Sequence, residues 1–240
     1  MKFRSQLACL FATALLAACG GGDDDDVVTT PASTPDATVA STLVFPVDQA
    51  ITVFQQNAQL FSLSAVVGAD TYSLDVTQTP GEAKPFNGGA ESVSTTLINA
   101  NIKKNGVDFK QARSEVYFKT GNYLQVGKVG MIPSLLTVTN PSSPIYMPLN
   151  ATVGQTGALS SATLYEEANA SEPMVWGSET ASWELRADTA LTAWLCFKTE
   201  TTPLAEPAYS ETDCYKIDAT GAVLGQSVTL TNGAQTLSFK

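Results

Sequence analysis

Residues 101–109, "NIKKNGVDF", decide the fold class of this chain. Asn105-Gly106 is the strongest two-residue signal for a β-hairpin, because both turn positions accept positive φ. Counted outward from the turn, the predicted pairs are Lys104–Val107, Lys103–Asp108 and Ile102–Phe109. The second pair brings opposite charges together and the third brings apolar residues together, and both pairings are favourable. The stretch therefore predicts an antiparallel hairpin, although a helix through 108–116 competes for its second half.

A second Asn-Gly signal lies near the C-terminus, at Asn232-Gly233. Counted in the same way, the turn predicts the pairs Thr231–Ala234, Leu230–Gln235 and Val228–Leu237. We therefore expect the last residues of the chain to form a paired strand.

The rest of the folded region, residues 42–240, also favours strands. Thr, Val, Ser and aromatic residues are plentiful and turn residues recur at short intervals, and no helix longer than about two turns is convincing. We predict an all-β fold of antiparallel sheets with little helix, either a β-sandwich or a barrel-like meander. The Pro-interrupted stretch 133–148 leaves open whether there is one domain or two sub-regions, 42–132 and 145–240. Further strands are expected at 60–67, 72–77, 92–99, 115–119, 123–126, 134–139, 162–165, 182–186, 191–198 and 213–217.

The N-terminal residues predict an export signal. A basic start, Met1 to Arg4, precedes an uncharged and mostly apolar run, Leu7 to Ala18, which is too short to span a bilayer. The run ends in Leu16-Ala17-Ala18-Cys19, which resembles the lipobox of bacterial lipoproteins. The resemblance implies that residues 1–18 are removed as a signal peptide and that Cys19 is lipidated. Because Gly20 and not Asp follows the cysteine, it also implies sorting to the outer membrane, on a face that the sequence leaves open.

Residues 19–41 form the predicted tether. Three glycines, the four aspartates Asp23 to Asp26 and a Thr/Ala/Ser/Pro-rich run offer almost nothing to bury in a core. The four like charges could gather a divalent ion, but a solvated spacer explains them more simply. We expect the lipid, and no spanning segment, to attach the protein to its membrane.

Two cysteines remain in the folded region, Cys196 and Cys214. An exported protein folds where disulfides form, so we expect this pair to be a disulfide, with two free thiols as the alternative. The alternation of Leu195 and Phe197, and of Tyr215 and Ile217, places the cysteines on the opposite and wetter face of two paired strands. The link 199–212 would then be a surface excursion closed at its base.

Composition excludes several classes of chemistry. The chain has 13 basic residues, 23 acidic residues and no histidine, with a formal net charge of −10. The lack of histidine rules out Ser-His-Asp sets and the common His-based zinc sites, and the acidic balance disfavours nucleic acid. We predict no catalytic residue, no metal site and no cofactor. The acids left for a carboxylate-dependent hydrolase are Glu166, Glu167, Glu179 and Glu184, and ordinary surface roles explain them more simply.

Two features favour binding. Trp176, beside Gly177 in a loop-like stretch, is the best candidate for a ligand contact among the three tryptophans. Residues 101–130 hold six basic and two acidic residues, so they either form a solvated face or dock on an acidic envelope polymer or protein partner. We therefore expect a non-enzymatic binding or structural module. The alternatives are an adhesin or glycan binder that uses loops 174–178 or 199–212, and a hydrolase of envelope polymers.

Overall fold

A computed structural model describes residues 40–86, 89–119, 124–132, 135–141, 146–166, 174–233 and 235–240. The predicted signal peptide, Cys19 and the tether as far as residue 39 lie outside the described residues. Within those ranges, no helix has the length and apolar character needed to cross a membrane.

The described residues contain one helix and twelve strands. The helix is α1 (Val47–Gln56). The strands are β1 (Gln59–Val67), β2 (Asp70–Pro85), β3 (Ser92–Lys104), β4 (Val107–Lys119), β5 (Leu124–Ile132), β6 (Leu135–Pro141), β7 (Thr156–Glu166), β8 (Met174–Ala187), β9 (Thr192–Pro203), β10 (Tyr209–Asp218), β11 (Val223–Asn232) and β12 (Gln235–Phe239).

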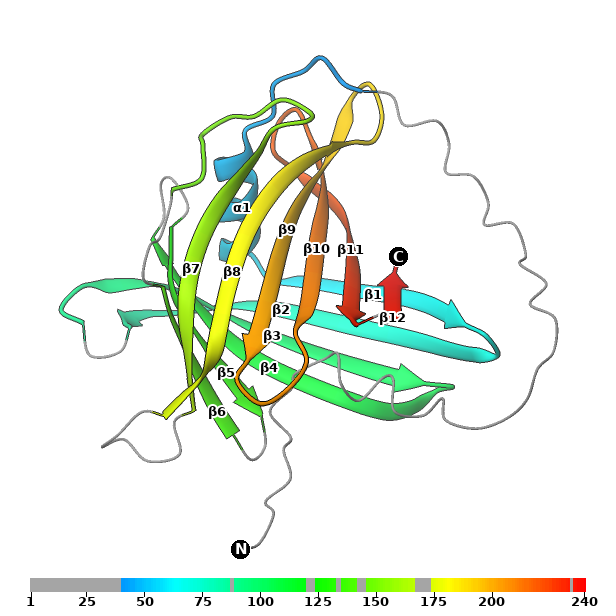
Figure 1. Cartoon of the computed structure of the whole chain (residues 1–240). Coiled ribbons are helices and arrows are strands. Elements are labelled where there is room, and N and C mark those ends of the chain that lie inside the picture. The colour runs from blue at the N-terminus through cyan, green and yellow to red at the C-terminus, as the bar shows by residue number, and fades with distance from the viewer. Residues whose placement is uncertain are drawn as a thin grey trace, which may run out of the picture.

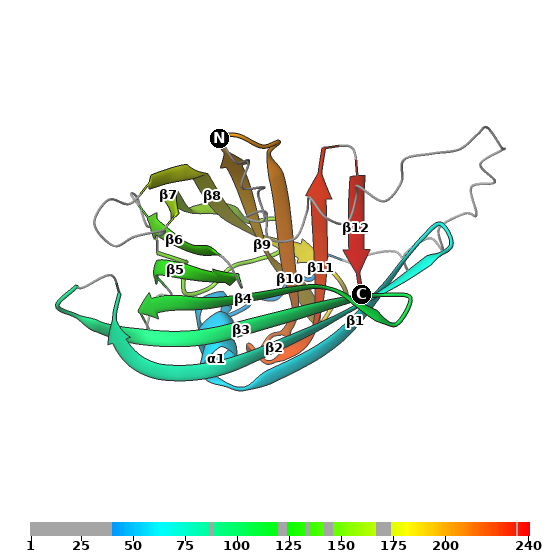
Figure 2. The ribbon, with the colours of Figure 1, turned by 90° about the horizontal axis from the view of Figure 1, so that it is seen from below.

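Each strand pairs antiparallel with its neighbours in sequence, from β1 through to β12. The long strands β1 to β4 lie in one layer, and β7 to β11 cross above them in a second layer (Figures 1 and 2). The meander is not closed into a barrel. The predicted all-β antiparallel fold with little helix is therefore confirmed, in its two-layered form.

The hairpin at Asn105-Gly106 forms as predicted, with φ of 52° and 81° at the two turn residues. Lys104 faces Val107 and Lys103 faces Asp108, but the third predicted pair is wrong. Ile102 lies opposite Lys110, because a bulge adds Phe109 as an extra residue on β4. Ile102 is fully buried, and the ring of Phe109 packs edge-on against Tyr72 at 6.3 Å.

The C-terminal hairpin also forms, but with a register two residues away from the predicted one. Leu230 pairs with Leu237 and Val228 with Phe239, and all four side chains are buried. The predicted register would have placed Gln235 opposite Leu230. Matching buried apolar residues outweighs the preferred Asn-Gly turn, and a shift by two leaves every side chain on its own face.

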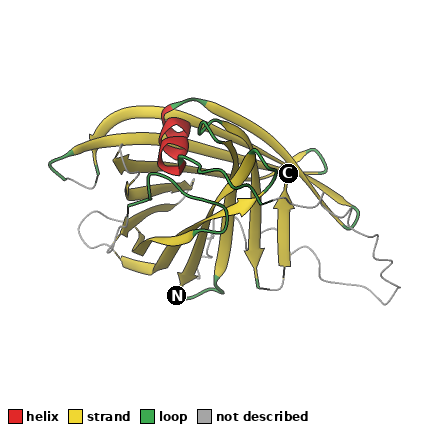
Figure 3. Ribbon diagram, turned by 90° about the horizontal axis from the view of Figure 1, so that it is seen from above, coloured by secondary structure: helices red, strands yellow, loops and turns green. Residues whose placement is uncertain are grey.

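Sequence analysis missed helix α1. Val47, Ala50, Ile51 and Phe54 follow the i, i+3, i+4, i+7 spacing of an amphipathic helix, and all four are buried. The ring of Phe54 lies 4.4 Å from that of Tyr215 on β10 and 6.0 Å from that of Phe61 on β1. The helix therefore packs between the two layers (Figure 3).

Side chains of the sheet cap the C-terminal end of α1. Gln78 on β2 donates its amide N–H to the Phe54 carbonyl at 2.6 Å, and Thr96 on β3 donates its hydroxyl to the Gln55 carbonyl at 2.8 Å. The Phe54 carbonyl also accepts from the backbone N–H of Asn57 at 3.3 Å, so the side chains of the sheet complete the hydrogen bonding of carbonyls at this helix end.

The core has two clusters that join the layers. One contains α1 and the inward face of β8 to β10, and the other joins β1 to β3 with β11 and β12. Near the second cluster, Ser64 of β1 and Lys240 exchange two backbone hydrogen bonds of 3.0 and 3.1 Å. This pair links the first strand to the last residue of the chain.

The predicted disulfide is present. Cys196 on β9 lies directly opposite Cys214 on β10, with a Cα separation of 4.0 Å. The cysteines do occupy the face opposite Leu195 and Tyr215, but they are only 1% and 6% exposed, so the prediction of a wet location is wrong. The guanidinium of Arg186 covers them, 3.9 Å from the Cys214 sulfur.

The predicted surface excursion between the cysteines is also shorter than expected. β9 continues to Pro203 and β10 begins at Tyr209, so only residues 204–208 connect them. The threonine-rich part of the stretch pairs with β8 and β10, which satisfies its backbone groups.

Candidate functional site

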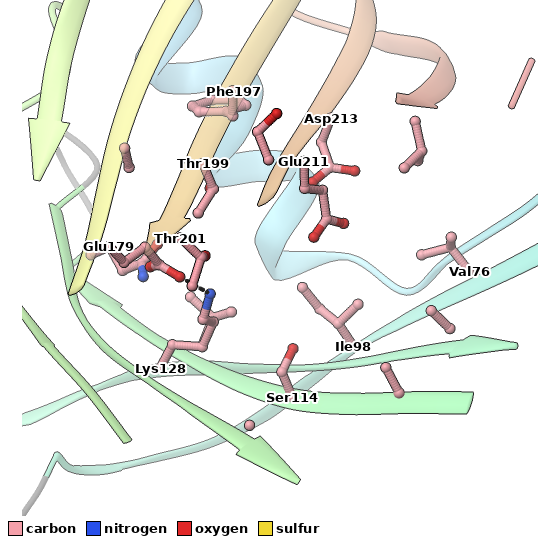
Figure 4. A pocket seen from close by; sticks show the side chains of 18 of the residues that line it. Val76, Ile98, Ser114, Lys128, Glu179, Phe197, Thr199, Thr201, Glu211 and Asp213 are labelled. Atoms are coloured by element: carbon pink, nitrogen blue, oxygen red, sulfur yellow. Dashed lines mark hydrogen bonds and ion pairs between the residues drawn. The ribbon is translucent and has the colours of Figure 1, made fainter. Parts of the chain in front are cut away.

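A cavity of about 250 Å³ lies between the two layers. This volume is just below the range of about 300–1,000 Å³ typical of small-molecule sites. Val76, Ile98 and Ala100 line it from the lower layer, and Phe197 and Val228 line it from the upper layer (Figure 4). A largely apolar chamber of this size suits a compact ligand better than a polymer chain.

Two acidic side chains project into this chamber from β10. Glu211 and Asp213 alternate in step with Tyr215 and Ile217, which belong to the core, so all four point inward. Their neighbours across the strands are apolar or hydroxylic. Asp213 faces Phe197 and Val228, and Glu211 faces Leu230 and Thr199.

An ion pair closes one side of the cavity. The ammonium of Lys128 on β5 lies 3.0 Å from a carboxylate oxygen of Glu179 on β8 (Figure 4). Glu179 is only 7% exposed, and Lys128 supplies the opposite charge beside this nearly buried carboxylate. Among the described residues, neither Glu211 nor Asp213 has an ion-pair or hydrogen-bond partner for its side chain.

Enclosure in protein disfavours charge on the two acids of β10. Burial raises the pKa of Asp213 well above its usual value, the nearby Glu211 raises it further, and Lys128 opposes both. Burial also raises the pKa of Glu211; Lys128 opposes this shift and Glu179 adds to it. Both side chains line the cavity and are partly exposed.

The lysine responds in the opposite way. Burial alone would lower the pKa of Lys128, but Glu179, Glu211 and Asp213 outweigh it and hold this pKa above its usual value. Lys128 therefore stays charged, while Asp213 keeps its proton to a higher pH than a carboxyl in water.

Two of the cavity's glutamines add further polar groups to the lining. Gln55 of α1 and Gln226 of β11 line the cavity and are 5% and 7% exposed. Among the residues that the structure describes, the side-chain oxygen of each has no hydrogen-bond partner. A buried amide oxygen without a partner costs about 1–3 kcal/mol, which a ligand bearing N–H or O–H groups would recover.

Trp176, the predicted ligand contact, lines the same cavity. The surrounding stretch is not a loop, because Met174 to Ser178 belong to β8. Trp176 is the extra residue of a bulge, since Leu164 pairs with Gly177 and Tyr165 pairs with Val175. Bulges re-aim side chains, which accounts for an indole that departs from the strand's alternation.

The acids considered for hydrolysis separate in space. Glu179 lines the cavity, whereas Glu184 lies on the outer face of β8 and pairs with Arg186. Glu167 lies outside the described residues, and the side chain of Glu166 is not described. No group of three or more acidic or cysteine side chains in the described ranges could hold a metal ion.

Nearby acidic side chains offset part of the positive charge of the basic stretch 101–130. Lys104 pairs with Asp70 at 2.7 Å, Lys119 pairs with Glu91, and Lys128 pairs with Glu179. Docking of this region on an acidic partner stays a prediction.

Sequence analysis did not find Glu211 and Asp213. The available signal was the alternation that already placed Tyr215 and Ile217 inward, because continued two and four residues upstream it places both acids on the core face. The two glutamines and Lys128 had no such signal, because their approach depends on how the layers pack.

Comparison of the chain with protein-family models, with curated proteins and with solved structures finds no match.

Proposed function

We propose that this protein is a lipid-anchored envelope protein that binds a small molecule in the cavity between its two layers. The observation that carries the proposal is the cavity itself, which combines apolar walls with buried polar groups that lack partners within the described ranges. Proteins seldom leave such groups unsatisfied unless another molecule or water meets them. Binding, and not catalysis, is the function that we assign to this site.

The anchoring half of the proposal rests on the sequence of the first 41 residues. The lipobox-like end at Cys19 supports lipid attachment, and the acidic, proline-containing tether supports a folded region held away from the membrane surface. Because Gly20 follows the cysteine, we assign the protein to the outer membrane. We do not assign it to one face of that membrane.

Ligand binding can be tested by blocking the cavity. Thr199 lines it, whereas Glu200, the next residue on β9, is exposed on the outer face. The full chain should enhance the fluorescence of 1-aminoanthracene, a small uncharged aromatic probe. Thr199→Trp should abolish this binding by filling the chamber, and Glu200→Trp should leave it intact.

Equal binding by both variants would show that the probe sits elsewhere and would overturn the proposal for this cavity. Absence of probe binding to the unaltered chain, while circular dichroism shows it folded, would count against it in the same way.

Anchoring can be tested independently in a bacterial host. Labelled fatty acid should appear in the full chain and not in Cys19→Ala, and only the unaltered chain should fractionate with outer membrane. Incorporation of label into Cys19→Ala would exclude Cys19 as the attachment point.

A further inference from the structure

We propose that the cavity selects an organic cation: a protonated amine on a compact apolar body, with its ammonium held between Glu211 and Asp213. The inference rests on the proposed binding function and names its ligand class.

The charges that face the cavity carry the first step. Lys128 is already matched to Glu179. Arg113 lines the cavity from an exposed position and acts on Glu115. Lys128 also attracts Glu211 and Asp213, but one ammonium cannot balance three carboxyls, so a further cation is favoured beside the two acids of β10. Their Cα atoms, two residues apart on one strand, are about 7 Å apart, so one ammonium can contact both carboxyls.

The orphan glutamine oxygens point independently to a ligand with several N–H donors. Gln226 is 7% exposed, lines the cavity, and lies opposite Tyr215, two pairs along the ladder from Asp213–Val228. Its side-chain oxygen accepts no hydrogen bond from any described part of the chain. An ammonium has three donors, enough for the two carboxyls and this amide oxygen.

The walls suit the remainder of such a ligand. Val76, Ile98 and Leu230 offer apolar surface, and the indole of Trp176 can attract a cation through its ring face. An anion would meet two carboxyls, and a hydrated divalent ion would lose water in a chamber that is mostly apolar. A compact amine satisfies both the charged side and the apolar side.

Binding should be linked to pH. An ammonium favours the ionised form of both acids, so binding releases the protons that burial helps them to retain. Affinity should therefore rise with pH through the range in which these acids ionise. The charged and titratable groups that face this space are Arg113, Lys128, Glu179, Tyr209, Glu211, Asp213 and Tyr215. Among these groups, the two acids of β10 are the carboxyls whose pKa burial raises.

The test compares three ligands of similar shape by isothermal titration calorimetry on the full chain at pH 8: 2-phenylethylamine, 2-phenylethanol and 3-phenylpropionate. The amine should bind at least about tenfold more tightly than the other two, which corresponds to about 1.4 kcal/mol for a charge-assisted contact. Its affinity should fall at pH 5, and titrations in phosphate and in Tris should differ in heat because protons are released.

Asp213→Asn and Glu211→Gln should each weaken amine binding about tenfold or more and reduce its pH dependence. Glu200→Gln, which removes an exposed carboxylate from the outer face of β9, is the matched control and should bind as the unaltered chain does. Calcium chloride, titrated alone, should give no binding heat.

The outcomes separate the two proposals. Preference for the alcohol or the carboxylate, or binding of calcium that is lost in Asp213→Asn, would overturn the amine and leave the ligand-binding cavity standing. If none of the three ligands displaces bound 1-aminoanthracene, the proposal of an amine ligand is likewise overturned. If the probe itself fails to bind, the cavity function falls as well.

Discussion

At the scale of single residues, Asp213 shows a conflict between ligand binding and the stability of the fold. Its pKa in the folded protein is raised by burial, so the folded state holds this proton more tightly than the unfolded chain does. Stability is therefore lost as pH rises from the unfolded pKa, near 3.9, through the folded one. A residue that weakens the fold while facing a cavity is typical of a binding site.

Asp213→Asn, which cannot ionise, should therefore raise the melting temperature at pH 8, less so at pH 6, and not at all at pH 3. Thermal unfolding followed by circular dichroism at the three pH values checks this. Glu200→Gln should show no such trend, because its carboxylate is exposed. A stability difference for Asp213→Asn that is independent of pH would exclude ionisation as its cause.

Lys128 has the opposite effect on stability, because its positive charge stabilises the carboxylate of Glu179. Lys128→Met should destabilise the protein by about 2–3 kcal/mol, since the nearly buried carboxylate of Glu179 loses its partner. Urea unfolding measures the loss, and the double variant Lys128→Met/Glu179→Leu should recover most of it. Lys119→Met removes a lysine whose partner, Glu91, is 66% exposed, and it should have little effect.

At the scale of elements, the Asn105 turn joins two hairpins. Its side-chain amide donates to Asp70 at 2.8 Å and its side-chain oxygen accepts from the Thr71 N–H at 2.9 Å, so the β3–β4 turn is held against the β1–β2 turn. The residue also adopts the left-handed φ of 52°.

A pair of substitutions separates these roles. Asn105→Ala should cost about 1–2 kcal/mol, because alanine resists positive φ and cannot make the side-chain bonds. Asn105→Gly keeps the permitted φ and loses only the bonds, so it should cost clearly less. Equal losses in urea unfolding would mean that the backbone conformation contributes nothing.

The disulfide joins β9 to β10, which carry much of the lining of the cavity. Cys196→Ala/Cys214→Ala should lower stability by about 3 kcal/mol in the chain-entropy model for a sequence separation of 18. Chemical unfolding with and without a reducing agent checks this. The unaltered chain under reducing conditions should match the double variant, and a mismatch would mean that the substitutions act through packing.

The elements also show how far the sequence could be read. The Asn-Gly turns, the disulfide and the strands were predictable, because turn chemistry and alternation are local signals. The bulge at Phe109 and the two-residue shift at Leu237 were not, because burial against other strands decided them. The apolar residues of helix α1 have the spacing of an amphipathic helix, but the strand signals around them caused it to be overlooked.

At the scale of the whole molecule, the predicted class was correct and the site was not foreseen. Trp176 was selected from the sequence and does line the cavity, although its role there stays a prediction. The cavity itself forms because two layers of one meander face each other with polar side chains between them. The pattern of residues along the sequence does not indicate how far apart the two layers lie.

The strand order has a consequence for how the molecule folds in time. Each strand needs only its neighbour in sequence, so hairpins can form one after another at small loop-closure cost, on the scale of microseconds. Contacts between distant segments, such as Phe54 with Tyr215 and Ser64 with Lys240, demand the longest closures and should form last. The cavity closes in this final step. A ligand held there should therefore slow unfolding while leaving the rate of folding almost unchanged.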